Sequence, residues 1–333
     1  MRVLIVGCGY VGVPLGAELV RLGHEVFGLR RSAAAEGELK AAGIQPLIGD
    51  VTRPGTLATL PRNFDWVVNC VAAGGNAENY REVYLQGTRN LIEWLAANPP
   101  KKFVYTSSTS VYAQNDGSQV VESSPTEPLA ETSRILVETE KVLLMAANSK
   151  FLAIPLNRPP ATFSPSGGEG RDEGASPAEM AKAQGGQSPA FPAVILRVAG
   201  IYWPDRGHWF KQFLKDAARI EGDGSRCLNM IHRDDLVGCI IAALKNGRAG
   251  EIYNAADDEP VSQLHFFQWL AQAVDKPLPP SEPENPAAVR RRGVTNKRVS
   301  NRKLKMELDH QFKYPTFRQG YSAELLRLNR AGK

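Results

Sequence analysis

The sequence predicts an α/β protein with a doubly wound parallel sheet, followed by a smaller domain made mainly of residues 199–333. Short apolar runs alternate with segments of helical periodicity along residues 1–198, which is the order of elements in such a sheet. The first run, residues 2–6, leads directly into the glycine-rich turn GCGYVG and then into a helical segment. Strand, glycine turn, helix and strand within about 30 residues form a βαβ unit typical of a Rossmann domain.

Each strand and helix is predicted by its own pattern of apolar residues. The run at 65–72 (DWVVNCVA) is apolar enough for a strand buried on both faces, as in a parallel sheet. In the segment 80–97, apolar residues recur every three to four positions and predict a helix. The expected strands are 2–6, 25–29, 45–50, 65–72, 102–107, 193–198 and 250–255, of which the last returns to the first domain. The expected helices are 13–22, 80–97, 131–147, 234–244 and 261–274.

Residues 157–190 interrupt this alternation. They contain six glycines, five prolines and few apolar residues, and they show no periodicity. Such a composition predicts a flexible loop inserted between a helix and a strand. A lid over the active site is the alternative interpretation, which the composition favours less.

Composition limits the cellular setting and the metal chemistry that we expect. No apolar run reaches the roughly 18 residues of a membrane helix, and no signal peptide is visible. The four cysteines form no CxxC pair and no cluster with histidine, so we expect no metal site and no disulfide framework. These observations predict a cytoplasmic protein with reduced thiols. The sequence leaves the oligomeric state open, with a homodimer as one alternative.

The positive charge of the chain is concentrated near its C-terminus. The net charge is +5, and residues 290–305 hold eight Lys or Arg and no acidic residue. Three interpretations are a nucleic-acid patch, a basic surface beside an anionic substrate, and a solvated edge. No aromatic residues that could stack on bases are interleaved with these charges, so nucleic-acid binding is the least favoured.

The glycine turn has the spacing with which a strand–helix junction binds a diphosphate. Gly7 allows the tight turn, Gly9 lets backbone N–H groups approach the phosphates, and Gly12 lets helix and strand pack closely. The helix N-terminus, which the chain enters through Tyr10 and Val11, attracts the phosphates. We therefore expect a dinucleotide cofactor, NAD or NADP, at this turn.

The end of the second strand favours NADP over NAD. An NAD site usually has an acidic residue roughly 20 residues beyond the glycine turn, where it binds the ribose 2′-hydroxyl. This chain has Arg30, Arg31 and Ser32 there. Arginine forks suit a 2′-phosphate, and no acid is present to repel it, so NADP is the expected cofactor. The alternative is an exposed basic turn without a role in binding.

Six motifs, in order along the chain, resemble those of the extended short-chain dehydrogenase/reductases, also called the NAD-dependent epimerase/dehydratase family. They are GCGYVG at 7–12, GDV at 49–51, NCVAA at 69–73, YTSSTSVY at 105–112, LRVAGIY at 196–202 and IHRDDL at 231–236. Only the insert at 157–190 and the far C-terminus lie outside the resemblance. It implies a Rossmann domain, residues 1–198, that binds NAD(P), and a smaller C-terminal substrate-binding domain.

The resemblance also implies which residues contact the cofactor. Asp50 and Val51 would flank the adenine. Val71, Ala72 and Ala73 would line the central part of the cofactor. Together with the glycine turn, these residues make the expected cofactor site.

The same resemblance assigns substrate contacts. Ser108 would occupy the place of the residue that hydrogen-bonds the reacting oxygen of the substrate. Tyr112, in the same motif, is a further candidate contact, although packing is the commoner role of this tyrosine. Arg206 would meet an anionic group of the substrate, as a substrate-domain arginine often does in members that act on nucleotide sugars.

The chain departs from the family at the catalytic Tyr-x-x-x-Lys motif. The aligned residues are Ala130 and Arg134. Alanine cannot transfer a proton, whereas Arg134 could still bind the ribose hydroxyls in place of the lysine. Tyr84 stands where the family often has an asparagine, and it is the preferred candidate for the missing acid. A packing role for Tyr84 is the alternative, and the more commonly expected one.

Two functions remain for the whole chain. One is an NADP(H)-dependent oxidoreductase or epimerase/dehydratase that acts on a small polar substrate, such as a sugar derivative. The other is a non-catalytic NADP(H)-binding sensor or scaffold, which the loss of the tyrosine and the lysine favours. The substrate-domain motifs that remain oppose this second function only weakly.

Overall fold

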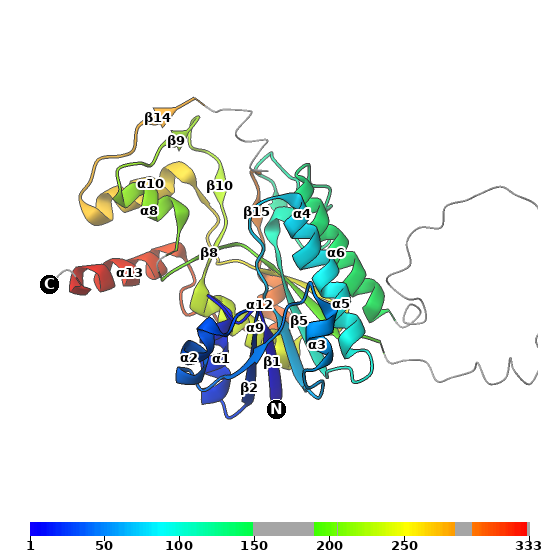
Figure 1. The fold of residues 1–333 in the computed structure, drawn as a ribbon. Helices are drawn as coiled ribbons and strands as arrows, with labels where there is room; N and C mark the ends of the chain where they lie inside the picture. The colour runs from blue at the N-terminus through cyan, green and yellow to red at the C-terminus, as the bar shows by residue number, and fades with distance from the viewer. Residues whose placement is uncertain (149–189, 205, 284–294, 332–333) are drawn as a thin grey trace, which may run out of the picture.

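A seven-stranded parallel sheet forms the centre of the molecule, as the computed structural model of residues 1–148, 190–204, 206–283 and 295–331 shows (Figure 1). Across the sheet the strands are β12 (Ile252–Ala255), β7 (Ala193–Val198), β5 (Lys102–Ser108), β4 (Trp66–Asn69), β1 (Arg2–Val6), β2 (Glu25–Arg30) and β3 (Gln45–Ile48). The order reverses between β1 and β4, since the chain first builds outward from β1 to β3. The predicted doubly wound α/β fold is therefore confirmed, and this reversal is where such sheets bind ligands.

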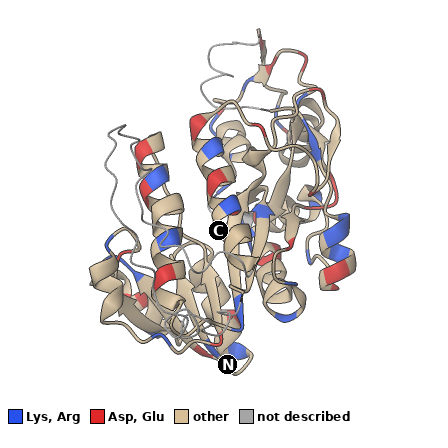
Figure 2. Ribbon diagram, turned by 90° about the vertical axis from the view of Figure 1, so that its right-hand side faces the viewer, with Lys and Arg blue, Asp and Glu red and all other residues tan. Residues whose placement is uncertain are grey.

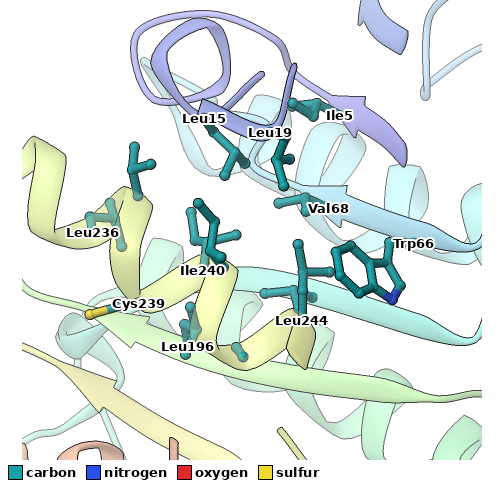
Figure 3. Packing of buried hydrophobic residues seen from close by; sticks show 14 of the residues in the cluster. Ile5, Leu15, Leu19, Trp66, Val68, Leu196, Leu236, Cys239, Ile240 and Leu244 are labelled. Carbon is teal, nitrogen blue, oxygen red and sulfur yellow. The ribbon is translucent and has the colours of Figure 1, made fainter. Parts of the chain in front are cut away.

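Helices cover both faces of the sheet. One face carries α1 (Gly12–Arg21), α2 (Glu36–Ala41), α9 (Arg233–Asn246) and α12 (Arg302–Leu308). The other face carries α3 (Pro54–Ala58), α5 (Gly87–Leu95) and α6 (Glu131–Ala147). On the first face, apolar side chains of α1 and α9 meet those of the strands, namely Leu15, Leu19, Leu236, Ile240 and Leu244 with Ile5, Val68 and Leu196 (Figure 3). Each such side chain contributes roughly 1.5–3 kcal/mol by its burial.

A smaller domain, at the upper left in Figure 1, has an aromatic core of its own. Tyr202 stacks on Tyr321 with ring centroids 4.4 Å apart, and Phe210 stacks on the same tyrosine at 4.8 Å. The elements of this domain are β8 (Gly200–Tyr202), α8 (His208–Leu214), β9 (Ile220–Glu221), β10 (Cys227–Leu228), β11 (Met230–His232), β13 (Val261–Ser262), α10 (Gln263–Val274), β14 (Ser281–Glu282) and α13 (Phe317–Ala331). Large aromatic rings are thus the dominant residue type in this small core.

The two domains are interleaved along the chain rather than consecutive. α9, β12 and α12 all follow residue 199, yet they pack on the main sheet. The physical reason is the apolar face of α9, which is buried against β5 and β7 of the sheet and against α1 and α12 beside it. The short strand β15 (Arg298–Val299) returns likewise and pairs with β6 (Gln119–Val120). The loop expected at 157–190 lies outside the described residues, except for residue 190.

The basic C-terminal segment is largely engaged within the molecule, as far as it is described. Lys303 pairs with Glu251 at 2.6 Å, and Lys305 pairs with Asp258 at 2.9 Å. Figure 2 shows blue and red segments interspersed over the helices. Within the described ranges, no helix is long and apolar enough to cross a membrane, and no group of metal-ligating side chains is assembled.

A buried ion pair and its hydrogen bonds join the neighbouring strands β5, β7 and β12 to the helix α6. Arg197 of β7 donates to both carboxylate oxygens of Glu140 on α6, with the shortest contact at 2.8 Å. Glu140 also accepts a hydrogen bond from Ser107 at the end of β5. Arg197 donates to the Tyr112 hydroxyl at 2.9 Å, and that hydroxyl donates to Asn254 of β12. Every charged atom of the pair therefore has a partner, as burial of charge requires.

Replacing Arg197 with methionine should lower the free energy of unfolding by about 3–5 kcal/mol, because it leaves the buried Glu140 carboxylate unpaired. Urea denaturation followed by circular dichroism measures the change. The matched control is Arg81→Met, which breaks an exposed pair with Glu138 on the same helix and should cost less than about 1 kcal/mol. Similar losses in the two variants would contradict the importance of burial.

Burial of His232 makes the stability of the fold depend on pH in the acid range. This residue is fully buried, and its Nδ1 accepts the N–H of Asp234 at the start of α9. Burial lowers the pKa of His232 from 6.5 to about 4. Between pH 6.5 and pH 4 the unfolded chain therefore binds a proton at this histidine that the folded chain does not bind. The free energy of unfolding keeps the full contribution of His232 above pH 6.5 and falls as the pH approaches 4.

The variant His232→Asn keeps a capping acceptor but does not titrate. Its unfolding free energy should fall less steeply than that of the original chain between pH 6.5 and pH 4. Thermal or urea unfolding at a series of pH values measures the two slopes. Identical slopes would show that His232 is not the group responsible.

Candidate functional site

A cavity of about 470 Å³ lies at the carboxyl ends of β1, β2 and β4, where the strand order reverses. The glycine turn, the end of β2, the turn after β3 and the segment after β4 supply most of its wall. Predicted site residues that line it are Gly7, Gly9, Tyr10, Val11, Arg30, Arg31, Asp50, Val51, Val71, Ala72, Ala73, Tyr84 and Arg206. The structure thus brings most of the predicted cofactor residues together in one place.

The glycine turn has a shape that side chains would prevent. Gly7 has φ +80°, and a Cβ there would lie 2.7 Å from the Val71 backbone. A Cβ on Gly12 would lie 3.1 Å from the Gly7 carbonyl oxygen. Because Gly12 has no side chain, α1 can start close to β1. No side chain caps the first turn of α1. The N–H of Val13 donates to the Gly9 carbonyl at 2.8 Å, and no side chain accepts from the start of this helix, which lies beside the cavity as an anion-binding terminus would.

The end of β2 presents two arginines to the cavity. Arg30 is half-buried, and its Nη1 donates to the Cys8 carbonyl at 2.6 Å, which holds it against the glycine turn. Arg31 is exposed. Ser32 does not line the cavity, because its hydroxyl accepts the N–H of Ala34 and caps the short 3₁₀ helix η1 (Ala33–Ala35). The cavity edge at β2 is therefore positively charged.

Asp50 is the acidic residue at the opposite side of this edge. One of its carboxylate oxygens accepts the N–H and the hydroxyl of Thr52, both at 2.9 Å. The carboxylate is thereby fixed in orientation.

Two thiols belong to the glycine turn and to the segment after β4, and burial raises the pKa of Cys8 to about 12 and that of Cys70 as well. Both thiols stay protonated, so neither is a nucleophile.

Tyr84 reaches the cavity from an unusual helical segment. α4 (Ala77–Tyr80) passes into the π-helical turn η2 (Arg81–Gln86), and such turns are frequent at functional sites. The Tyr84 hydroxyl accepts the N–H of Ala73 at 3.1 Å. Burial raises the pKa of Tyr84, so its phenol is neutral. A neutral phenol can donate a proton but cannot remove one.

Two predicted catalytic residues, Ser108 at the end of β5 and Arg134 on α6, are not among the residues that line the cavity. Ser108 is half-buried, and its hydroxyl accepts the N–H of Ser110 at the 3₁₀ turn η3 (Thr109–Val111). Arg134 is exposed near the start of α6. Tyr112 is fully buried and hydrogen-bonded to Asn254 and Arg197, and it does not line the cavity.

Sequence reasoning missed several residues of the cavity wall. Ser107, rather than Ser108, lines the cavity, and its hydroxyl donates to Glu140 at 2.6 Å. The sequence did contain a signal for this choice. Neighbouring side chains on a strand point to opposite faces, so Ser107 and Ser108 could not both face the same side of β5. Thr52 and Asn79 also line the wall, and no motif of this chain singled them out.

Comparison with known proteins agrees with this geometry. The model of the NAD dependent epimerase/dehydratase family matches residues 3–256. Protein YeeZ of Escherichia coli K12 is 23% identical over 321 residues, which cover 94% of this chain and 96% of YeeZ.

Solved structures extend the comparison to the whole fold. A putative NAD-dependent epimerase/dehydratase from Methylobacillus flagellatus is 27% identical, with 98% of both chains covered and a TM-score of 0.69. UDP-glucuronic acid 4-epimerase from Bacillus cereus, solved with UDP-glucuronic acid and NAD, is 20% identical. It covers 99% of this chain and 100% of its own with a TM-score of 0.73, a likeness of fold. Since the family model spans most of the sequence, the chain belongs to the NAD-dependent epimerase/dehydratase family.

Proposed function

We propose that this protein binds NADP(H) in the cavity and uses it as an oxidoreductase or epimerase/dehydratase on a small polar substrate. One observation carries the proposal: an uncapped helix terminus and two arginines line one cavity, and no acid stands at the end of β2. The Bacillus cereus epimerase was solved with NAD, so the choice between the cofactors needs its own test.

The residues that line the cavity fit such a dinucleotide. The N–H groups at the start of α1 suit its diphosphate, and Arg30 and Arg31 suit a 2′-phosphate. Val71 to Ala73 supply a wall without charge for its central part. When bound, the nicotinamide supplies hydride transfer, while the chain must position the substrate and move its proton.

Tyr84 is our candidate for the proton donor. It lines the cavity, and burial keeps its phenol neutral. Its hydrogen bond from Ala73 fixes the oxygen beside the segment proposed for the cofactor. Roles for Ser108 at the reacting oxygen and for Arg134 at the ribose are supported by the family resemblance alone, since neither lines the cavity.

A non-catalytic NADP(H)-binding sensor is the second candidate. It is favoured by Ala130, which stands in the tyrosine position at the start of α6 and offers no proton. Screening carbonyl and sugar substrates for NADPH oxidation by absorbance separates the two candidates. Turnover that is lost in Tyr84→Phe with unchanged NADPH affinity would support the enzyme and contradict the sensor.

The test of cofactor binding is a thermal-shift titration with NADPH and, separately, with NADH. A ligand of the folded state raises the unfolding midpoint as its concentration rises. We expect a clear shift with NADPH and a small one with NADH. No shift with either would overturn the proposed function.

The double variant Arg30→Ala, Arg31→Ala should weaken NADPH binding by about tenfold or more and leave NADH binding nearly unchanged. The reason is the loss of charge-assisted hydrogen bonds to the 2′-phosphate, at about 1.5–3 kcal/mol each. Isothermal titration calorimetry measures both affinities. Arg62→Ala is the control, because Arg62 is exposed and does not line the cavity. Equal losses for NADPH and NADH would refute the NADP preference.

A further inference from the structure

Tyr10 joins the glycine turn to the smaller domain. Tyr10, at the centre of the turn, donates its hydroxyl proton to the carbonyl oxygen of Trp203. The N–H of Trp203 donates to the Arg206 carbonyl at 3.3 Å and closes this segment on itself. Trp203 has φ +63°, a left-handed conformation that is strained for a bulky residue. The Tyr10 contact is one of the interactions that hold this strained segment in place.

The side chain of Arg206 lies on the ring of the same tyrosine. Its guanidinium carbon is 4.0 Å from the Tyr10 ring centroid, which is a close cation–π contact. A second arginine, Arg233, lies 5.7 Å from that centroid, but it donates twice to the Asp234 carboxylate. Arg206 is exposed, and no described carboxylate pairs with it. Its planar face is thus occupied by the ring, while its N–H groups remain for an anion.

The position of Arg206 in the cavity indicates which anion this is. Arg206 lines the same wall as Gly9, Tyr10 and Val11, the residues that lead into the uncapped terminus of α1. Because its guanidinium stacks on Tyr10, it stands beside the backbone that suits a diphosphate. The family resemblance implies that Arg206 binds the substrate, whereas these contacts place its guanidinium beside the glycine turn.

We propose that Arg206 binds the diphosphate of the dinucleotide, with Tyr10 as the platform that places it there. The inference rests on the proposed function and deepens it. The smaller domain then contributes directly to cofactor binding, and the cofactor is held between the two domains. Arg30 and Arg31 recognise one end of the ligand, and Arg206 recognises its middle.

Calorimetry with fragments of the cofactor tests this division of roles. ADP-ribose carries the diphosphate without a 2′-phosphate, and 2′-AMP carries a 2′-phosphate without the diphosphate. Arg206→Met should weaken ADP-ribose and NADPH by about tenfold or more, the loss of a charged hydrogen bond, and leave 2′-AMP unchanged. The double variant Arg30→Ala, Arg31→Ala should weaken 2′-AMP binding and leave ADP-ribose binding unchanged. Arg206→Lys should restore part of the loss, since the charge returns without the fork.

Arg318→Met is the matched control, because Arg318 also stacks on a ring, at 4.6 Å from Phe317, but does not line the cavity. It should bind all ligands as the original chain does. Tyr10→Leu should weaken ADP-ribose, and its loss should not add fully to that of Arg206→Met, because the two side chains act as one unit. Fully additive losses would contradict the platform role.

The outcomes separate this inference from the proposed function. If the original chain binds NADPH and ADP-ribose, but Arg206→Met binds ADP-ribose equally well, the assignment of Arg206 to the diphosphate is wrong while the function stands. If the original chain binds none of the ligands, the proposed function and the role of Arg206 are both wrong. Loss of ADP-ribose affinity in Arg206→Met alone, with Arg318→Met unaffected, supports the proposal.

Discussion

The ion pair between Arg197 and Glu140 is the interaction on which the architecture around the site depends. Burial alone would lower the pKa of Arg197, but the hydrogen bonds and charge of Glu140 outweigh this effect and raise it. Two opposite charges removed from water are tolerated only when each polar atom has a partner. Here those partners are Ser107 at the end of β5, the Tyr112 hydroxyl after β5 and the Glu122 carbonyl, and the Tyr112 hydroxyl in turn donates to Asn254 of β12. The pair therefore fixes the relative position of segments that no hairpin connects.

This constraint extends to the cavity through Ser107. Its hydroxyl donates to Glu140, so the end of β5 is held at the cavity wall from behind. On the other side of the cavity, Tyr10 connects the glycine turn with the strained segment at Trp203. The cavity lining thus comes mostly from the main sheet and its turns, with Ile201 and Arg206 added by the smaller domain. A ligand that contacts both walls would stabilise the domain arrangement as well as itself.

Much of the fold could be predicted, because strands and helices have local periodicities. The buried run of β4 and the glycine turn before α1 are visible in the sequence for this reason. Long-range partners leave no local trace. Tyr112 meets Asn254, which lies 142 positions away, and nothing near Tyr112 in the sequence indicates that its hydroxyl is buried. The interleaving of the domains through α9 was hidden likewise, since an amphipathic pattern indicates a buried face but not the surface that covers it.

The two halves of the site differ in the kind of chemistry on which they depend. The proposed cofactor half relies on backbone shape, at Gly7 and at the start of α1, and this shape survives changes in most side chains. Proton transfer relies on one side chain at one place, and Ala130, where the family resemblance implies that side chain, offers no proton. Tyr84 can replace only part of that function, because its raised pKa keeps the proton on the phenol near neutral pH. A donor of this kind suits reduction of a carbonyl, which needs a proton delivered to oxygen, better than oxidation of an alcohol, which needs one removed. If Tyr84 is the proton donor, burial keeps its phenol in the protonated form that delivery of a proton to a carbonyl oxygen requires.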